Sequence, residues 1–392
     1  MGYQHGYLLK NQCIENLRAI LNCSDHGLFG SRGIKYERLL EMWDEMDEYI
    51  PQCYIDEMHG LADGADVSFE NVSAAYMVFV WIDMLMAKAC SGIAAWGNST
   101  VDDNLYHVRS CDLPPVIKDP VTGKYAHESC VLIIREPNDG YSSVSPSVIG
   151  TSHMGGGVNE NGISVGLQVC SSQDNKFSGT PAWIKCSMIL DNASDINESI
   201  DIIISNKTLG WNYILSDAKI PIGYAIETTG NYSYVGTYND AVESKHPFTE
   251  IKDVVRRTNF FIDPVTASTQ RNSYNIAGFT GFIKFLLGKN IYFTIWRIYR
   301  STTKQIQKNW GKIDVNASMD ILRTVYSMET DLFMFMFSKS INAFSMPWNQ
   351  WAYCYETGEF AVSFADINNG AWANPVHYFN FDDLMELEAP AR

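Results

Sequence analysis

The spacing of apolar residues changes near residue 90 of this chain. Before that point, apolar side chains recur every three or four positions, which is typical of amphipathic helices, as in Leu9, Cys13, Leu17 and Leu21. After it, apolar and polar residues alternate, which is typical of strands, as around Ile163, Val165, Leu167 and Val169. The sequence therefore predicts a helical segment over 1–89, followed by a domain over 90–392 that mixes strands and helices.

The second part is expected to interleave both kinds of element. Strands are predicted over 163–170, 211–216, 223–227, 232–235, 351–355 and 360–364. Helices are predicted over 181–190, 195–205, 282–309 and 317–327. Strands flanked by helices in mixed order are typical of stacked sheets with helical covers, so the predicted fold class is α+β.

A hairpin is predicted where the pattern changes. Residues 90–97 are small and apolar like a strand, 98–104 supply turn residues, and 105–112 have the pattern of a returning strand. A turn centred near Val101 brings residue 90 back to about residue 112. The two ends of the hairpin are therefore expected to meet.

Three ionisable side chains meet at that point. Arg109 and Asp112 are expected beside Cys90. A guanidinium favours the thiolate that a nucleophilic cysteine needs. A carboxylate can hold an ammonium, which Cys90 would carry once the bond after Ala89 is cut. The constellation therefore predicts a self-cleavage site at Ala89–Cys90.

The order of motifs resembles the cysteine-type N-terminal-nucleophile hydrolases, in particular the isopenicillin N acyltransferase and bile salt hydrolase relatives (the acyl-CoA:6-aminopenicillanic acid acyltransferase family). These proteins have an Arg-x-x-Asp motif after the nucleophile, as Arg109-Ser-Cys-Asp112 follows Cys90 here. Further segments are similar to the family's and follow in its order: 157–168, 211–217, 225–229, 257–260, 296–300 and 311–314.

The resemblance implies an αββα four-layer sandwich preceded by a helical proregion. Self-cleavage would give an α chain, residues 1–89, and a β chain, residues 90–392, which stay associated. The mature protein would be an amidohydrolase or acyltransferase that needs no cofactor. Its partner would be a small-molecule amide or acyl substrate, and the sequence leaves a homo-oligomer open.

The resemblance also assigns roles to single residues. Cys90, Arg109 and Asp112 would be catalytic, and Asn259 would supply the oxyanion hole. Gln168 and Arg297 would contact the substrate, with Arg271 and Arg300 as alternatives to Arg297. Two departures bear on the substrate: Gln168 stands where bile salt hydrolases carry Asn, and Phe260 stands where many acyltransferase relatives carry His.

The chemistry expected of an N-terminal cysteine leaves the substrate open. Its α-amine can take the thiol proton, and the thiolate can then attack an amide carbonyl to form an acyl-thioester. The substrate would be a non-peptide or short-peptide amide, or alternatively a lipid amide or ester, as in phospholipase B-like and ceramidase relatives. A third alternative is a catalytically dead relative that serves as a binding protein.

Composition narrows the remaining classes. A net charge of −16 argues against nucleic acid as a partner. The longest apolar stretches are interrupted by charges, so no membrane span is expected. The nine cysteines include no Cys-x-x-Cys pair, which favours free thiols in a reducing compartment. No signal peptide is visible in residues 1–9, which favours a cytoplasmic protein, although an upstream leader is left open.

Two other enzyme classes fit the sequence less well. Gly162-Ile-Ser-Val-Gly166 matches the nucleophile elbow of α/β-hydrolases, with His377 among the later histidines. That elbow needs a helix directly after its serine, whereas a strand pattern runs through Ser164. The eight histidines show no His-Glu-x-x-His spacing, so no metal site is expected.

Overall fold

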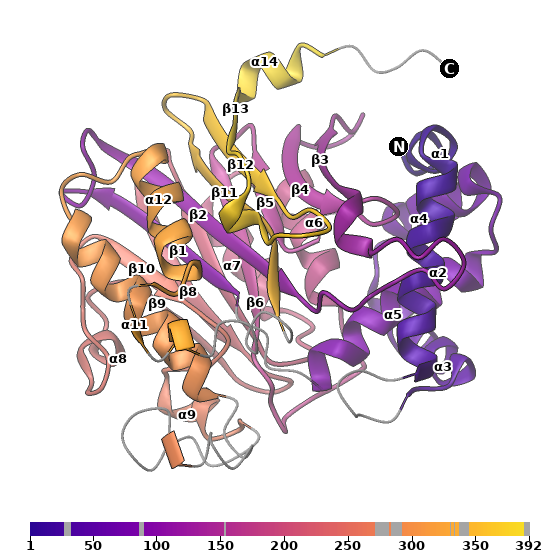
Figure 1. Ribbon diagram of the computed structural model, residues 1–392, viewed down its shortest axis with the longest axis horizontal. Helices are drawn as coiled ribbons and strands as arrows, with labels where there is room; N and C mark the ends of the chain where they lie inside the picture. The colour runs from indigo at the N-terminus through magenta and orange to yellow at the C-terminus, as the bar shows by residue number, and fades with distance from the viewer. Residues whose placement is uncertain are drawn as a thin grey trace.

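The computed structural model describes residues 1–26, 33–85, 90–152, 154–270, 282–283, 292–329, 331–332, 334–336 and 345–387. Two antiparallel sheets and the helices around them make up these residues, as Figure 1 shows. The predicted α+β class is therefore confirmed. Within the described residues, no helix is long and apolar enough to cross a lipid bilayer.

The N-terminal segment is helical, as predicted. Its helices are α1 (Gly2–Leu8), α2 (Lys10–His26), α3 (Tyr36–Met46), α4 (Gln52–Ala65) and α5 (Phe69–Leu85). Helix α1 lies so close to α4 that a Cβ at Gly2 would be 1.8 Å from the Glu57 carbonyl oxygen, so this contact requires glycine. The segment shares one apolar core with residues of the later domain, including Leu113, Val148 and Trp183.

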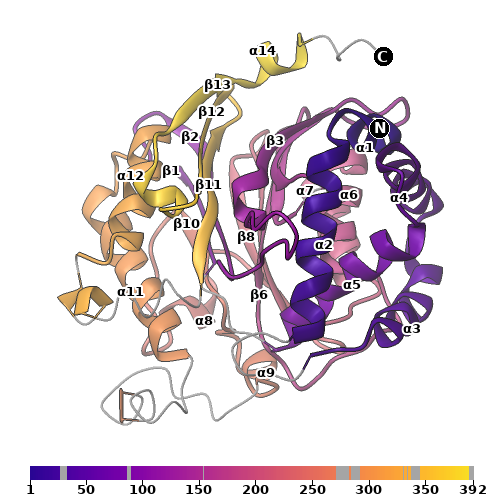
Figure 2. The same ribbon diagram turned by 45° about the vertical axis from the view of Figure 1, so that its right-hand side comes forward.

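The first sheet has six strands in the order β10-β1-β2-β11-β12-β13. They are β1 (Ser91–Gly97), β2 (Asp103–Leu113), β10 (Val254–Arg257), β11 (Met346–Cys354), β12 (Glu359–Phe364) and β13 (His377–Asn380). Helix α12 (Val315–Tyr326) packs on β2, β11 and β12, and α11 (Tyr292–Asn309) packs on α12. Figure 2 shows both helices on the side of this sheet away from α1–α5.

The second sheet has seven strands joined in sequence order from β3 to β9. They are β3 (Cys130–Arg135), β4 (Ser143–Val148), β5 (Gly156–Asn159), β6 (Ile163–Val169), β7 (Trp211–Asp217), β8 (Ile222–Thr228) and β9 (Ser233–Gly236). Helices α6 (Ala182–Asn192) and α7 (Ile196–Ile204) pack on this sheet, and strands β6, β7 and β8 contact β1 of the first sheet. The two sheets therefore face each other.

The remaining elements are short. They are the helices α8 (Ala241–Ser244), α9 (Pro264–Ala267) and α14 (Phe381–Met385), and three 3-10 turns, at Asp47–Tyr49, Ala126–Ser129 and Ala371–Ala373. Strands β3, β4, β5, β10 and β13 are not predicted from sequence. Three of them have four residues, too few for a period of two to be recognised, and β4 contains Pro146 among serines.

Candidate functional site

Cys90 directly precedes β1, at the end of the predicted hairpin. Strands β1 and β2 pair antiparallel, with Ser91 opposite Ser110 and Gly92 opposite Arg109. The backbone N–H of Asp112 donates to Cys90 Sγ at 3.4 Å, and Cys90 Sγ donates to the Asp112 carbonyl at 3.6 Å. The hairpin thus brings Cys90 beside Asp112, as predicted.

One face of this hairpin points toward the second sheet. Because side chains alternate along a strand, Cys90 shares a face with Gly92, Arg109 and Cys111. A Cβ built on Gly166 of β6 would lie 2.9 Å from Arg109 Cδ. The thiol and the guanidinium therefore lie between the two sheets.

The other face of the hairpin points toward α12. Ser91 Oγ lies 2.9 Å from the hydroxyl of Tyr326, and Ser110 Oγ donates to Asp112 Oδ1 at 2.7 Å. Asp112 is fully buried. The backbone of Cys90 consequently lies between its own sulfur on one face and the Asp112 carboxyl group on the other.

A cavity of about 60 Å³ lies beside Cys90 on the first face. Cys90, Arg109 and Cys111 line it together with Gly155. The rest of its wall is mostly apolar and includes Tyr76, Phe79, Asp83, Leu113, Met154, Leu167, Val169, Trp183 and Trp211. Three of these residues come from α5, so the N-terminal helical segment closes one side of the cavity.

Arg109 is buried among groups that can carry negative charge. Burial alone would lower the pKa of Arg109, but Cys90, Cys111 and Asp112 raise it above its usual value. Its Nε donates to the Gly155 carbonyl at 3.2 Å. Since the guanidinium stays charged, it can favour a thiolate on Cys90.

Asp112 lies where an ionised carboxylate is costly. Burial and the charge of a Cys90 thiolate raise the pKa of Asp112 well above its usual value, whereas hydrogen bonds from Ser110 and Tyr326 and the charge of Arg109 lower it. A positive charge placed beside this carboxyl group would favour its ionised form. The α-amine of a cleaved Cys90 would supply such a charge.

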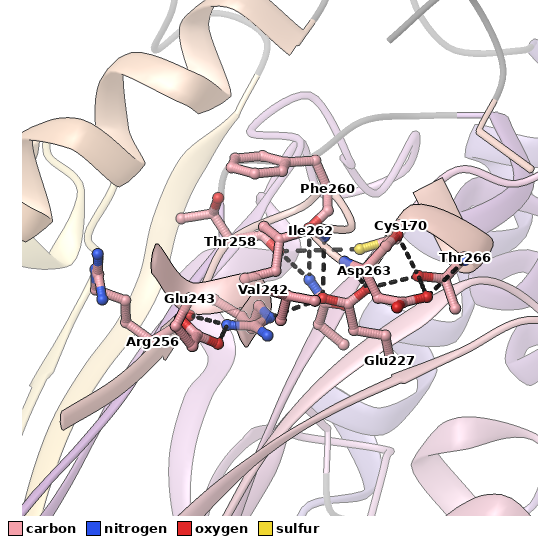
Figure 3. Close-up of polar contacts among 12 residues, drawn as sticks. Cys170, Glu227, Val242, Glu243, Arg256, Thr258, Phe260, Ile262, Asp263 and Thr266 are labelled. Carbon is pink, nitrogen blue, oxygen red and sulfur yellow. Dashed lines mark hydrogen bonds and ion pairs between the residues drawn. The ribbon is translucent and has the colours of Figure 1, made fainter. Parts of the chain in front are cut away.

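Asn259 lies in the loop that follows β10. A buried ionic network around Glu227 holds this loop, and Figure 3 shows the network. Glu227 accepts from Arg257 Nε at 2.9 Å and from the backbone N–H of Ile262 at 3.0 Å, and Arg257 also pairs with Glu243. Asn259 is fully buried and its Nδ2 donates to the Val169 carbonyl at 2.8 Å. Asn259 is therefore fixed beside the end of β6, but it does not line the cavity.

Gln168 is fully buried between the two sheets. A Cβ on Gly92, two residues after Cys90, would lie 2.4 Å from Gln168 Nε2. Within the described part of the chain, neither amide atom of Gln168 has a hydrogen-bond partner. An unpaired buried amide near Cys90 is a second candidate oxyanion donor.

The other predicted residues are not gathered at the cavity. Arg297 on α11 binds the carboxylate of Asp331, with its Nη2 2.6 Å from Oδ1, and does not line the cavity. Arg300 is exposed. Ala89 and Arg271 lie outside the described residues.

The described residues bear on the nucleophile elbow at Ser164. Strand β6 runs without interruption through Ser164, which pairs with Val158 and Ser216, so the elbow geometry is absent. In the described residues, no group of three or more histidine, cysteine or acidic side chains could hold a metal ion.

Cys111 and the aromatic wall of the cavity are not predicted from sequence. The hairpin pairing could have indicated Cys111, because it follows Ser110, the partner of Ser91, and Cys90 precedes Ser91. The wall from α5 gives no comparable signal, since an apolar helix that is buried on all sides does not show which side chains face a cavity.

No family model matches the chain. A protein of Archaeoglobus fulgidus described as uncharacterized is 24% identical over 362 residues, which cover 82% of this chain and 55% of that protein. Protein dcd1A of Dictyostelium discoideum is 23% identical over 227 residues, covering 54% of this chain and 49% of that protein. The chain thus spans about half the length of the curated relatives it matches.

Two solved structures are similar at low identity. A mutant conjugated bile acid hydrolase from Clostridium perfringens has 12% identity and a TM-score of 0.43, covering 75% of this chain and 93% of that one. A Caenorhabditis elegans ortholog of N-acylethanolamine-hydrolyzing acid amidase has 13% identity and a TM-score of 0.42, covering 67% and 92%. TM-scores this low do not establish a shared fold.

Proposed function

We propose that this chain is a cysteine amide hydrolase or acyltransferase that activates itself by cutting the bond between Ala89 and Cys90. It would then work as a cysteine-type N-terminal-nucleophile hydrolase, with the αββα sandwich of that family. The observation that best supports the proposal is the position of Cys90, with Arg109 and the cavity on one face of the hairpin and Asp112 on the other.

Self-cleavage gives Cys90 two catalytic groups. Its α-amine, with a pKa of about 7.7–8.0 when unperturbed, takes the thiol proton. The thiolate attacks the amide carbonyl, the amine leaves, and the acyl group remains on sulfur as a thioester. Water or a second amine then takes the acyl group. Arg109 favours the thiolate and Asp112 holds the ammonium, so each charge acts on a different atom of Cys90.

The helical segment is expected to stay bound after cleavage. Arg18 binds Asp119 through two hydrogen bonds of 3.1 and 2.8 Å, and Asn16 Nδ2 donates to the Ile149 carbonyl at 2.8 Å. Arg135, which is nearly fully buried, pairs with Glu57. Together with the shared apolar core, these contacts would hold an α chain of residues 1–89 on the β chain.

The cavity favours an apolar acyl group. Aromatic and aliphatic side chains form most of its wall, and Asp83 is the acidic residue in the lining. Burying apolar surface contributes about 25 cal/mol per Å², so longer acyl chains should bind more tightly as far as the cavity extends. This composition also suits the alternative substrate class of lipid amides.

The proposed activity can be tested with acyl derivatives of 7-amino-4-methylcoumarin, from acetyl to octanoyl. Release of the fluorescent amine by the wild-type protein, and none by Cys90→Ala, is the expected result. A preference for the longer acyl chains would favour lipid-like amides over short-peptide amides. Equal release by both proteins would contradict a role for Cys90.

Asn259 is proposed as the oxyanion donor. Its amide nitrogen has two N–H groups and one donates to the Val169 carbonyl, so the other N–H is left to donate to a developing oxyanion. Asn259→Ala is expected to slow acylation by about a hundredfold, the typical effect of losing one such donor. Single-turnover kinetics would measure this, while the dissociation constant of the substrate should change much less.

Gln168→Ala is the matched comparison, because its amide is equally buried and lies nearer Gly92. A smaller loss in Gln168→Ala than in Asn259→Ala is expected. If Asn259→Ala changes acylation by less than about threefold and Gln168→Ala removes it, Gln168 fills the role instead. The contact of Arg297 with substrate stays a prediction, and it would require Arg297 to leave its ion pair with Asp331.

A further inference from the structure

A second thiol lies next to Cys90 in the cavity. We propose that Cys90 and Cys111 form a two-cysteine redox site, in which a peroxide oxidises Cys90 and Cys111 then traps the product as a disulfide across β1 and β2. The site goes beyond the proposed amide chemistry. Only the expected effect of disulfide formation on amide turnover rests on the proposed function.

The strand pairing gives the two cysteines suitable geometry. The pair next to Ser91 and Ser110 in the register is Cys90 and Cys111, and both side chains are on the face toward β6. Residues opposite each other in antiparallel strands have Cα atoms about 4.5 or 5.5 Å apart. Both separations lie in the range of about 4.4–6.8 Å that disulfides span. A bond would therefore need little movement of the backbone.

The two sulfur atoms share one environment. Both cysteines are nearly fully buried, both line the cavity, and their side chains are within hydrogen-bonding reach of each other. Cys111 Sγ also lies against the turn at Gly155, where a Cβ would be 3.2 Å from it. The absence of a side chain at Gly155 thus leaves room for the Cys111 sulfur beside the cavity.

The chemistry balances with a hydroperoxide as the oxidant. The Cys90 thiolate attacks one peroxide oxygen, the O–O bond breaks, and Cys90 becomes a sulfenic acid as hydroxide leaves. Cys111 sulfur then attacks the Cys90 sulfur, the S–O bond breaks, and water leaves with the Cys111 proton. Two thiols and one hydrogen peroxide give one disulfide and two waters, and a thiol reductant reverses the oxidation.

The surroundings favour Cys90 as the first sulfur to react. Arg109 is close to both thiols and can stabilise a thiolate. The hydrogen bond with Cys90 and burial raise the pKa of Cys111 well above its usual value, which disfavours a thiolate on Cys111. The cavity of about 60 Å³ is larger than the 10–15 Å³ that one water needs, which leaves room for hydrogen peroxide.

A direct test is peptide mapping of the full chain after brief treatment with hydrogen peroxide and blocking of the remaining thiols. A cross-linked pair of peptides carrying Cys90 and Cys111 is expected, and dithiothreitol should separate it. Amide turnover should fall with the same time course and return with the reductant. This mapping does not depend on turnover, so it can succeed or fail independently of the amidase proposal.

Two variants make the test specific. Cys111→Ser should lose the cross-link and accumulate irreversible sulfinic acid on Cys90, because no thiol remains to trap the sulfenic acid. Cys170→Ser is the matched control, because Cys170 is also buried and is near enough to Cys90 for the charges of the two groups to interact. This variant should keep the cross-link between Cys90 and Cys111. A wild-type chain in which Cys90 becomes sulfinic acid without a cross-link, pairs with Cys170, or does not react would overturn the proposal.

Discussion

Cys90→Ala is expected to abolish both self-cleavage and amide turnover. The sulfur of Cys90, which lines the cavity, is the nucleophile for both steps. After cleavage, the α-amine of the same residue would be the base that takes the thiol proton. Turnover should fall to the background rate, measured with the coumarin amides. The folded chain should be retained, because the substitution removes one sulfur atom from a site that already contains a cavity.

Two comparisons separate chemistry from packing in this experiment. Cys90→Ser keeps a side chain of similar size but ionises far less, so it should fold normally and turn over slowly. Cys170→Ala removes another buried thiol near the site and should leave both cleavage and turnover close to wild type. Loss of both activities in Cys170→Ala as well would point to a packing defect rather than to a nucleophile.

Asp112→Asn is expected to reduce turnover by about a hundredfold or more, even in protein that has already been cleaved. The amide keeps the size of the carboxyl group and can still accept from Ser110, but it cannot neutralise an ammonium on Cys90. The new α-amine would then lose its orientation and its counter-charge. Asp103→Asn, an exposed acid at the start of β2, is the matched control and should have no effect.

The same residue makes a prediction about stability in the uncleaved chain. Burial raises the pKa of Asp112 above its unfolded value, so the folded state favours the protonated form. The stability that this form contributes is present at low pH and is lost as pH rises. In the Cys90→Ala background, Asp112→Asn should therefore raise the midpoint of thermal unfolding more at pH 8 than at pH 4. An equal change at both pH values would contradict the assigned ionisation.

Local sequence patterns predict the individual helices and strands of this fold better than they predict how these elements pair and pack. The strand at Ile163–Val169 follows from the alternation of apolar and polar residues, and the helix predicted over 195–205 is found at Ile196–Ile204. The hairpin is also predicted, but a turn centred near Val101 sets residue 90 opposite about 112, whereas the pairing leads to 111. The turn is in fact centred near residue 100, with Gly97 opposite Asp103, and the shift in register between Ala95 and Gly97 moves the partners of the preceding residues by one position.

The candidate site could be predicted only as far as the hairpin reaches. Cys90, Arg109 and Asp112 lie within one local unit, so their proximity follows from a single turn. The aromatic wall from α5 and the position of Asn259 depend on packing between segments far apart in the chain. Arg297 shows the same limit, because it lies on α11 and its partner Asp331 lies in a bend after α12, and the sequence does not indicate that the two side chains meet.

The central claim is that the chain cuts itself before Cys90, and the intact mass of the purified protein tests it most directly. Two chains of 89 and 392 − 89 = 303 residues are expected, with Cys90 leading the larger chain on N-terminal sequencing. Both should elute together on gel filtration, as the Arg18–Asp119 and Arg135–Glu57 pairs imply. An uncut chain with no activity would favour a binding protein that retains the fold. A single uncut chain that still hydrolyses amides would contradict the mechanism.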